Sequence, residues 1–361
     1  MTIGVFGLSA SGKTTIFSLL TGIETDPAVR RRDGISGTAL VHDPRVDQLA
    51  LIFRPKKVTC ASLTFIDMPG FDVKAMESEK TRVMQFIQGA DAILAVVRAF
   101  DSSAVAWPQG CETPAAQFDM IRTELLLRDL SVVETRLGRI AETERKRNRL
   151  TEDEQAERRI LTDVRTNLEK ELFVNRQELP AQDLKAIGSL GLFTAKPIVI
   201  VVNTDEDQLS RKSYPDQDYI REQCDRNGFA SIELSGKIEA EISQLEEMDR
   251  QVFLREFGFH ESGIQRLSRV VYEHVGLISF LTVGEDEVKA WTIRSGTCAR
   301  DAAGAIHTRL AETFIRAEVI PHETFMTVRD MKVARSQNLI RLAGRDEIVE
   351  DGNIFHVRAG G

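Results

Sequence analysis

Cysteine is scarce in this chain of 361 residues, and its four copies lie far apart in the sequence. Cys60, Cys111, Cys224 and Cys298 show no paired spacing, which argues against a disulfide framework and against a zinc site. The six histidines likewise lack the spacing of metal ligands. The pattern is typical of a protein from a reducing compartment.

Long apolar runs are missing as well. The longest, such as residues 198–202, are far shorter than the roughly 18 residues that indicate a membrane-spanning helix. We see no signal-peptide pattern, because Gly7 and a phosphate-binding motif interrupt the apolar start almost at once. We therefore expect a cytoplasmic protein without a membrane partner.

Positive charge is in deficit, since the net charge is −8. Such a chain does not look like a general nucleic-acid binder, and we expect no DNA partner. Contact with RNA would have to use local basic patches, of which the candidates are residues 30–32, 54–57 and 145–149 and the pair Lys332 and Arg335. For each of these patches, we expect a solvated charged surface, and contact with RNA is the alternative.

Continuous apolar runs of strand length alternate with helical patterns in the first part of the chain and near residue 200. Residues 1–6, 92–98 and 197–202 are such runs, and another run of this kind ends at Asp67. Runs of this type are typical of parallel strands buried on both faces. We therefore expect an α/β nucleotide-binding domain with a mostly parallel sheet, whose ligand lies beyond the carboxyl ends of the strands.

The pattern changes between residues 113 and 180, where charge rises and apolar residues recur at helical spacing. Thr113 before Pro114 indicates one helix start, and Thr151 with Glu154 forms a capping box for a second. These signals predict a helical, coiled-coil hairpin inserted into the nucleotide-binding domain.

The last part of the chain reads as two strands, one helix over about residues 300–314, and further strands. It has the size of a small α+β domain. The predicted division is therefore 1–112 with 181–276 for the P-loop domain, 113–180 for the hairpin, and 277–361 for the small C-terminal domain.

The strongest motif lies at residues 7–14, which fit G-x-x-x-x-G-K-[ST] after a predicted strand and before a predicted helix. The glycines allow successive backbone N–H groups to point at phosphate oxygens, and the helix N-terminus adds its positive dipole. Lys13 is expected to neutralise β- and γ-phosphate charge, and Thr14 to bind Mg²⁺. The predicted phosphate-side residues are Ser9, Ala10, Ser11, Gly12, Lys13, Thr14 and Thr15.

A second motif, D-x-x-G, follows the strand that ends at Asp67. We expect Asp67 to hold the Mg²⁺ shell and the Gly70 N–H to sense the γ-phosphate, so that Lys13 and Gly70 are the catalytic candidates. Many GTPases place a glutamine directly after this glycine to orient water, but here the residue is Phe71. We therefore predict slow hydrolysis that depends on another group, a monovalent cation or a partner.

The base-recognition candidates follow two other strands. Asn203-Thr204-Asp205-Glu206 stands where guanine-specific proteins have N-K-x-D, and the longer Glu206 does not fit the bidentate guanine contact. Asn203 and backbone groups near Thr204 are expected to read the base, and Ser235 and Gly236 to contact it through their backbone. These features predict ATP over GTP as the ligand, with GTP as the alternative.

Together these residues make the chain resemble the Obg-like ATPase (YchF) family over nearly its whole length. The resemblance implies a nucleotide-binding domain with a coiled-coil arm, a ubiquitin-like TGS domain, ATP preference through an N-x-x-E motif, and association with ribosomes. The most specific stretches are residues 42–49 (His-Asp-Pro-Arg-Val-Asp-Gln-Leu), 96–100, 235–242, 289–292, 306–308, 314–319 and 349–352.

The chain also departs from that family's pattern. Ser9-Ala10-Ser11 stands where the family usually has Pro-Asn-Val, and the family's Mg²⁺-binding threonine falls near Arg31, with Ser36 and Thr38 as weak substitutes. We therefore expect a divergent member of the family.

The sequence thus predicts an ATP-binding, slowly hydrolysing switch protein that acts on ribosomes or RNA. A GTPase with relaxed base choice is one alternative. The other is a nucleotide-dependent binding module with negligible turnover.

Overall fold

The computed structural model describes residues 1–24, 34–67, 83–85, 87–256 and 258–360. The chain divides into two compact units, of which the first contains residues 1–37 and 64–267 and the second residues 38–63 and 268–361. The domain boundaries predicted from the sequence placed residues 38–63 in the P-loop domain, whereas the structure places them in the second unit. No described helix is long and apolar enough to cross a membrane.

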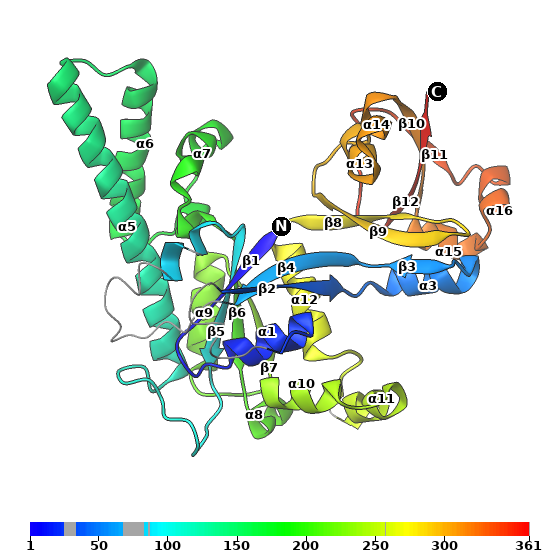
Figure 1. The fold of residues 1–361 in the computed structure, drawn as a ribbon, viewed down its shortest axis with the longest axis horizontal. Helices are drawn as coiled ribbons and strands as arrows, with labels where there is room; N and C mark the ends of the chain where they lie inside the picture. Colours follow the sequence, from blue (N-terminus) through cyan, green and yellow to red (C-terminus); the bar gives the residue numbers. More distant parts are fainter. Residues whose placement is uncertain (25–33, 68–82, 86, 257, 361) are drawn as a thin grey trace. The chain divides into compact units, whose positions relative to one another are not determined.

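A six-stranded sheet with the order β2-β4-β1-β5-β6-β7 lies mainly in the first unit (Figure 1), although residues 38–41 of β2 and 61–63 of β4 are counted with the second. The pairs β4–β1, β1–β5, β5–β6 and β6–β7 are parallel, which confirms the mostly parallel sheet. Every residue of β5 and β6 is buried, as continuous apolar runs require. The strands are β1 (Thr2–Phe6), β2 (Ile35–Val41), β4 (Ala61–Asp67), β5 (Ala92–Arg98), β6 (Ile198–Asn203) and β7 (Ala230–Leu234).

Helices of the first unit pack on this sheet and on one another: α5 packs on β5, α9 on β7, and α1 on α10. The boundary between the two units falls within α12 (Gly263–His274). Further helices of this unit, outside the hairpin, include α1 (Lys13–Thr21), α7 (Ala181–Ile187), α8 (Glu206–Arg211), α9 (Gln217–Asn227), α10 (Gly236–Ser243), α11 (Glu247–Glu256), and the 3-10 turns η1 (Val174–Arg176), η2 (Gly188–Leu190) and η3 (Phe193–Ala195).

The inserted hairpin consists of α5 (Pro114–Arg147) and α6 (Glu152–Glu169), which run side by side away from the sheet in Figure 1. The Thr113 hydroxyl accepts from the Ala116 N–H, and the Thr151 capping box is complete. Apolar residues of both helices belong to the core of the first unit, among them Val133, Ile140, Leu161 and Val164. The helices thus begin where the caps predicted.

The second unit has a six-stranded sheet with the order β11-β10-β12-β8-β9-β3. An antiparallel β8–β9 hairpin is followed by α13 (Ala299–Ile306), which packs on β9 and β10, and β12 returns parallel to β8. This is the predicted ubiquitin-like arrangement. The strands are β3 (Lys57–Thr59), β8 (Leu277–Thr282), β9 (Glu287–Arg294), β10 (Phe314–Pro321), β11 (Arg341–Ala343) and β12 (Asn353–Ala359).

The prediction of a single helix over about residues 300–314 is wrong. His307 has an extended backbone and divides it into α13 and α14 (Thr308–Glu312), and its Nδ1 accepts the Arg309 N–H at 3.2 Å. Phe314 already belongs to β10. The remaining helices of this unit are α3 (Pro44–Phe53), α15 (His322–Val328) and α16 (Met331–Ser336).

Residues 38–63 contribute a strand and a helix to this second unit. β3 pairs in parallel with β9, and α3 packs on β9 as well. The Lys56 Nζ lies 2.8 Å from an Asp286 oxygen, and the Thr59 hydroxyl donates to Glu287 at 2.6 Å. The C-terminal sheet therefore includes a strand from near the start of the chain.

Candidate functional site

The turn between β1 and α1 has the backbone shape of a phosphate-binding loop. Gly7, Ala10 and Gly12 have φ values of 154°, 64° and 89°, so the chain reverses repeatedly within six residues. A Cβ atom on Gly12 would lie 2.2 Å from the Asn203 Nδ2, closer than side-chain contacts allow. Both the backbone angle and the space therefore require glycine at this position.

Two oxygen-bearing side chains meet beside this loop. The Thr14 hydroxyl, at the start of α1, donates to the Asp67 Oδ2 at 3.1 Å, and Asp67 ends β4 without exposure to solvent. Lys13 is only 5% exposed. The Ser11 hydroxyl is buried without a hydrogen-bond partner in the described part of the chain. Hydroxyl and carboxylate oxygens are the donor set that Mg²⁺ prefers, so this pair fits the predicted metal.

Asn203, the last residue of β6, connects two loops. Its Nδ2 donates to the Ser11 carbonyl at 3.0 Å, and its Oδ1 accepts the Gly236 N–H at 2.9 Å. The side chain therefore fixes the phosphate loop to the start of α10. Base reading remains the prediction for Asn203, and this structural role accompanies it.

Thr204 is turned into the protein. Its N–H and its hydroxyl both donate to the Leu234 carbonyl, at 2.9 and 3.2 Å, and the residue is 3% exposed. Glu206 is exposed in the first turn of α8 and lines a cavity of about 530 Å³ together with Lys237. The other lining residues are Asp101, Asp205, Asp207, Gln208, Arg211 and Ser213.

Hydrogen bonds fix the first turn of α10 to its own cap and to the start of α12. The Ser235 hydroxyl accepts the Ile238 N–H at 3.5 Å, and the Glu239 carboxylate accepts the N–H groups of Gly263 and Ile264 at 2.7 and 3.2 Å. Burial raises the pKa of Glu239, against the lowering effect of these backbone donors. Ser235 and Gly236 thus lie at a hydrogen-bonded helix start next to Asn203.

Arg98 is a residue of this region to which the sequence analysis assigned no role. It ends β5 without solvent exposure, and its guanidinium stacks between the rings of Phe100 and Trp107, at 4.5 and 4.4 Å from their centroids. It also donates to the carbonyls of Phe100, Val105 and Ala106. Burial lowers the pKa of Arg98. The sequence signal that could have pointed to Arg98 is a cation at the end of an apolar run.

This stacking positions Phe100 at the phosphate loop. The Phe100 ring lies 3.9 Å from the place of a Cβ on Gly12, and Gln208 donates to the neighbouring Ala99 carbonyl at 2.9 Å. The segment after β5 is therefore part of the site.

Known proteins resemble this chain over nearly its full length. The protein named Ribosome-binding ATPase YchF of Bacillus subtilis (strain 168) is 32% identical over 364 residues, which cover 99% of each chain. Its namesake from Escherichia coli O157:H7 is 32% identical over 358 residues, which cover 98% of this chain and 97% of that protein. This chain belongs to the YchF family.

Two further comparisons agree with that assignment. The family model YchF-GTPase_C, described as "Protein of unknown function (DUF933)", matches residues 277–360. The solved structure of the Schizosaccharomyces pombe YchF GTPase superposes with a TM-score of 0.85 at 26% identity, covering 99% of this chain and 97% of that one. The fold class and the family resemblance are thus confirmed.

Some predicted residues of this YchF-family chain lie outside the described residues. These are Gly70 and Phe71 of the D-x-x-G segment and Arg31 of the switch segment. The structure otherwise brings together the phosphate loop, Asp67, Asn203 and Gly236 in its first unit.

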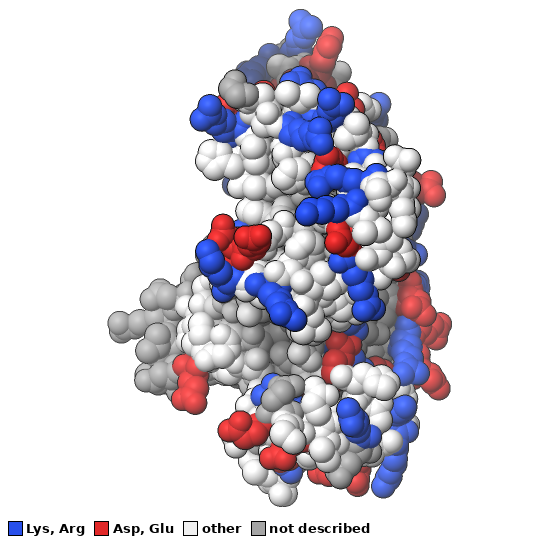
Figure 2. Space-filling view, turned by 90° about the vertical axis from the view of Figure 1, so that its right-hand side faces the viewer, with Lys and Arg blue, Asp and Glu red and all other residues white. Residues whose placement is uncertain are grey.

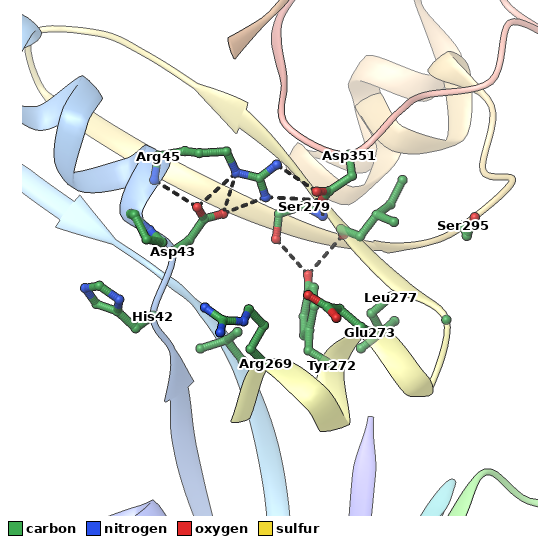
Figure 3. A pocket seen from close by; sticks show the side chains of 14 residues that line it. His42, Asp43, Arg45, Arg269, Tyr272, Glu273, Leu277, Ser279, Ser295 and Asp351 are labelled. Carbon is green, nitrogen blue, oxygen red and sulfur yellow. Dashed lines mark hydrogen bonds and ion pairs between the residues drawn. The ribbon is translucent and has the colours of Figure 1, made fainter. Parts of the chain in front are cut away.

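A larger cavity, of about 640 Å³, lies in the second unit of the protein (Figure 3). Arg45 lines it and donates to Asp43 and to Asp351, whose Oδ1 accepts the Ser279 N–H at 2.8 Å. The Tyr272 hydroxyl lies 2.8 Å from the Ser279 hydroxyl. These polar groups satisfy one another, which indicates that they connect residues 42–45 to the C-terminal sheet.

Proposed function

We propose that this protein is an ATP-binding P-loop switch protein that hydrolyses ATP slowly and acts on ribosomes. The observation that carries the proposal is the 3.1 Å contact between Thr14 and Asp67 beside the glycine-defined loop. The relatives named Ribosome-binding ATPase support both the nucleotide and the ribosomal partner.

The described residues suggest how the nucleotide is held. The backbone N–H groups of residues 9–15 and the Lys13 ammonium would bind the phosphates, as the motif predicts. Thr14 and Asp67 would hold Mg²⁺, which supplies neutralisation of the developing phosphate charge. Gly70 stays a catalytic candidate from the sequence. We therefore assign Lys13 to charge stabilisation and Asp67 to metal positioning.

Adenine is the proposed base. The Thr204 side chain is bonded to the Leu234 carbonyl and has no aliphatic stem to cover a base, while Glu206 is one methylene longer than the aspartate that binds guanine. A carboxylate that does not fit the N1–H and amine donors of guanine adds little binding free energy for GTP. ATP is therefore favoured, and a GTPase with relaxed base choice is the alternative.

Slow turnover follows from the sequence of the D-x-x-G segment. Phe71 has no group that can orient water, so the chemistry requires a group from elsewhere, a cation or the ribosome. A binding module with negligible turnover is the competing reading. A cytoplasmic location goes with the proposed ribosomal role.

Calorimetry with Mg²⁺ and either purine triphosphate tests the nucleotide part. The wild type should bind ATP more tightly than GTP, and Lys13→Ala should lose roughly a hundredfold or more in affinity, because a charge-assisted phosphate contact is removed. The matched control is Lys185→Ala on exposed α7, which should bind as the wild type does. Tight binding by Lys13→Ala would contradict the proposal.

Ribosome co-sedimentation and single-turnover hydrolysis test the rest. We expect the protein to pellet with ribosomes in a nucleotide-dependent manner, and ribosomes to accelerate hydrolysis. Failure to pellet in either nucleotide state would refute the ribosomal role. Hydrolysis that stays negligible with ribosomes would favour the binding-module alternative.

A further inference from the structure

A second cavity of the first unit, of about 240 Å³, is lined by residues of α8, α9, β7 and α12 and of the loops between them. It is distinct from the cavity of about 530 Å³ that Glu206 lines. No described residue that we assign to the phosphates or to Mg²⁺ lines it. Sites for drug-sized ligands have volumes of roughly 300–1,000 Å³, so a ligand of this cavity would be smaller than a nucleotide.

The Tyr214 side chain brings a hydroxyl without a partner to this cavity. Tyr214 is 7% exposed, and its ring belongs to the core of the first unit. Among the described residues, none accepts a hydrogen bond from its hydroxyl. The phenol interacts electrostatically with Glu233 and Arg221, which also line the cavity, so its hydroxyl end lies on the cavity side. A hydrogen bond to a ligand would offset the cost of burying this unpaired group.

The Tyr214 hydroxyl also keeps its proton. Burial raises the pKa of Tyr214, and the negative charge of Glu233 acts in the same direction. At neutral pH the phenol is therefore a hydrogen-bond donor. The group that suits it best is an acceptor without protons of its own, such as a carboxylate.

Positive charge is in excess around the cavity, since Lys212, Arg221 and Arg266 line it with Glu233 as the one carboxylate. The Arg221 Nη2 donates to the Glu233 Oε1 at 3.0 Å, so these two charges offset each other. The Arg266 Nη2 donates to the Glu233 backbone carbonyl at 3.3 Å. Lys212 is exposed and forms no ion pair with any residue that the structure describes.

This balance of charge differs from that of the surface in Figure 2, where Lys and Arg side chains are interspersed with Asp and Glu. An excess of positive charge in a small cavity favours an anionic ligand. The Glu233 carboxylate in the same wall disfavours a second negative charge on that ligand. A monoanion therefore fits better than a phosphate ester.

The remaining walls of the cavity are apolar. The Arg266 guanidinium lies over the Phe259 ring, at 5.0 Å from its centroid, which fixes both side chains. Leu209 is 9% exposed and packs in one cluster with Phe259. Together with the Tyr214 ring, these side chains offer flat apolar surface. A small aromatic carboxylate combines such a flat body with acceptor oxygens and one negative charge.

Two residues connect this cavity to the nucleotide side of α8. Gln208 and Ser213 line both this cavity and the one that Glu206 lines. The Gln208 side chain accepts the Asp205 N–H at 3.2 Å and donates to the Ala99 carbonyl at 2.9 Å. A ligand that contacts Gln208 therefore acts on the segment that we expect to read the base.

We propose that this cavity is an effector site for a small aromatic carboxylate, which changes the affinity for ATP through α8. The carboxylate would accept from the Tyr214 hydroxyl and pair with the Lys212 ammonium, while its ring would pack on Phe259. The effector part of the inference rests on the proposed ATP binding, whereas the binding part does not. Because coupling between two ligands is reciprocal, ATP should change the affinity for the carboxylate by the same factor.

The test titrates the full-length protein with 4-fluorobenzoate and follows its ¹⁹F NMR signal. Saturable binding with a Kd on the order of 1 mM or below is expected for a ligand of about ten non-hydrogen atoms. The neutral 4-fluorobenzamide and the ringless trifluoroacetate should each bind at least about tenfold more weakly. Absence of saturable binding would show that the cavity holds only water and would overturn the proposal. Equal binding of either comparison compound would overturn the assigned ligand class.

Tyr214→Phe removes the hydroxyl and keeps the ring. This variant should bind 4-fluorobenzoate roughly tenfold more weakly, because a hydrogen bond to a charged group is lost. Its melting temperature should equal that of the wild type, since the hydroxyl has no partner in the protein. The matched control is Tyr219→Phe on α9, whose hydroxyl donates to Asp119 at 2.9 Å outside the cavity. Equal affinities in the two variants would overturn the proposal.

Lys212→Gln tests the charge at the rim of the cavity. We expect a severalfold loss of affinity for 4-fluorobenzoate and little change for 4-fluorobenzamide, because only the first compound is charged. Lys185→Gln on α7 removes the same charge from an exposed position and should bind both compounds as the wild type does. An equal effect of the two lysine variants would contradict the pairing with Lys212.

Calorimetry with ATP at increasing 4-fluorobenzoate tests the effector part. The Kd for ATP should change by about fivefold or more and reach a plateau, as expected for two separate sites. An unchanged Kd would overturn the effector role, and a change without a plateau would place the carboxylate in the nucleotide site. Missing ATP binding with intact carboxylate binding would refute the proposed function alone. Missing carboxylate binding with intact ATP binding would refute the effector site alone.

Discussion

The Asn203 Nδ2 donates to the carbonyl oxygen of Ser11 at 3.0 Å and so links the end of β6 to the middle of the phosphate loop. The Oδ1 of the same side chain accepts the Gly236 N–H at 2.9 Å. Because both contacts are buried, Asn203→Ala leaves a carbonyl and an N–H without partners. We expect this variant to lose affinity for ATP and GTP alike, by roughly tenfold or more in calorimetry.

Asn227→Ala on α9 is the control, since Asn227 is buried and its side chain donates to the Gln223 carbonyl of the same helix at 2.7 Å. A loss by Asn203→Ala confined to ATP would show that base reading, rather than loop support, dominates the role of Asn203.

The double change Thr204→Lys with Glu206→Asp should move base preference towards GTP. It introduces the lysine stem and the shorter carboxylate that guanine recognition uses, and a matched hydrogen-bonding site discriminates by tenfold or more. Competition between ATP and GTP for the Mg²⁺-loaded protein measures the ratio. Asp207→Asn, which alters a neighbouring acid of the same cavity, should keep the wild-type ratio. An unchanged ratio in the double variant would contradict the geometric reading of Glu206.

Gly352→Ala should destabilise the second unit by about 1–3 kcal/mol. Gly352 has φ 76°, and an added Cβ would lie 2.4 Å from the Nη1 of Arg45, which Asp43 and Asp351 hold in place. Urea unfolding followed by Trp291 fluorescence, in a Trp107→Phe background, measures the effect. Gly344→Ala is the control, since open space surrounds that position. Equal midpoints for the two alanine variants would count against the contact.

Asp129 predicts a pH dependence of stability. It is fully buried on α5, and burial raises its pKa to about 6 against an ordinary 3.8, although Phe193 and Thr194 donate to it. Between these values the folded state keeps a proton that the unfolded state has lost. The contribution of the Asp129 carboxyl to the free energy of unfolding is therefore complete below about pH 4 and is lost as the pH rises through 6. In all it amounts to on the order of 3 kcal/mol.

Asp129→Asn removes this titration while keeping the side-chain shape. In urea unfolding, the free energy of unfolding of the wild type minus that of Asp129→Asn should fall as the pH rises from about 4 to 7, because only the wild type carries this titration. A difference that stays constant over this interval would show that the Asp129 carboxyl titrates alike in both states.

The phosphate loop could be predicted from the sequence because its glycines are required by backbone geometry that any ligand-binding loop of this type must adopt. Caps at Thr113 and Thr151 located the hairpin for the same local reason. The partners of Glu318 could not be predicted, since they come from α16 and β12 and meet only in the folded sheet. Arg98 was missed because its two stacking rings follow in a segment without periodicity.

β3 was missed for a different reason: it has three residues, and its partner β9 lies about 230 positions later in the chain. This pairing determines how a C-terminal fragment of the protein will behave. A fragment that begins at residue 277 keeps the ubiquitin-like strands but leaves the β9 edge open and uncovers Val288, which is fully buried in the intact chain. Such a fragment should self-associate through this open edge, whereas a fragment that also carries residues 38–63 should keep β9 paired.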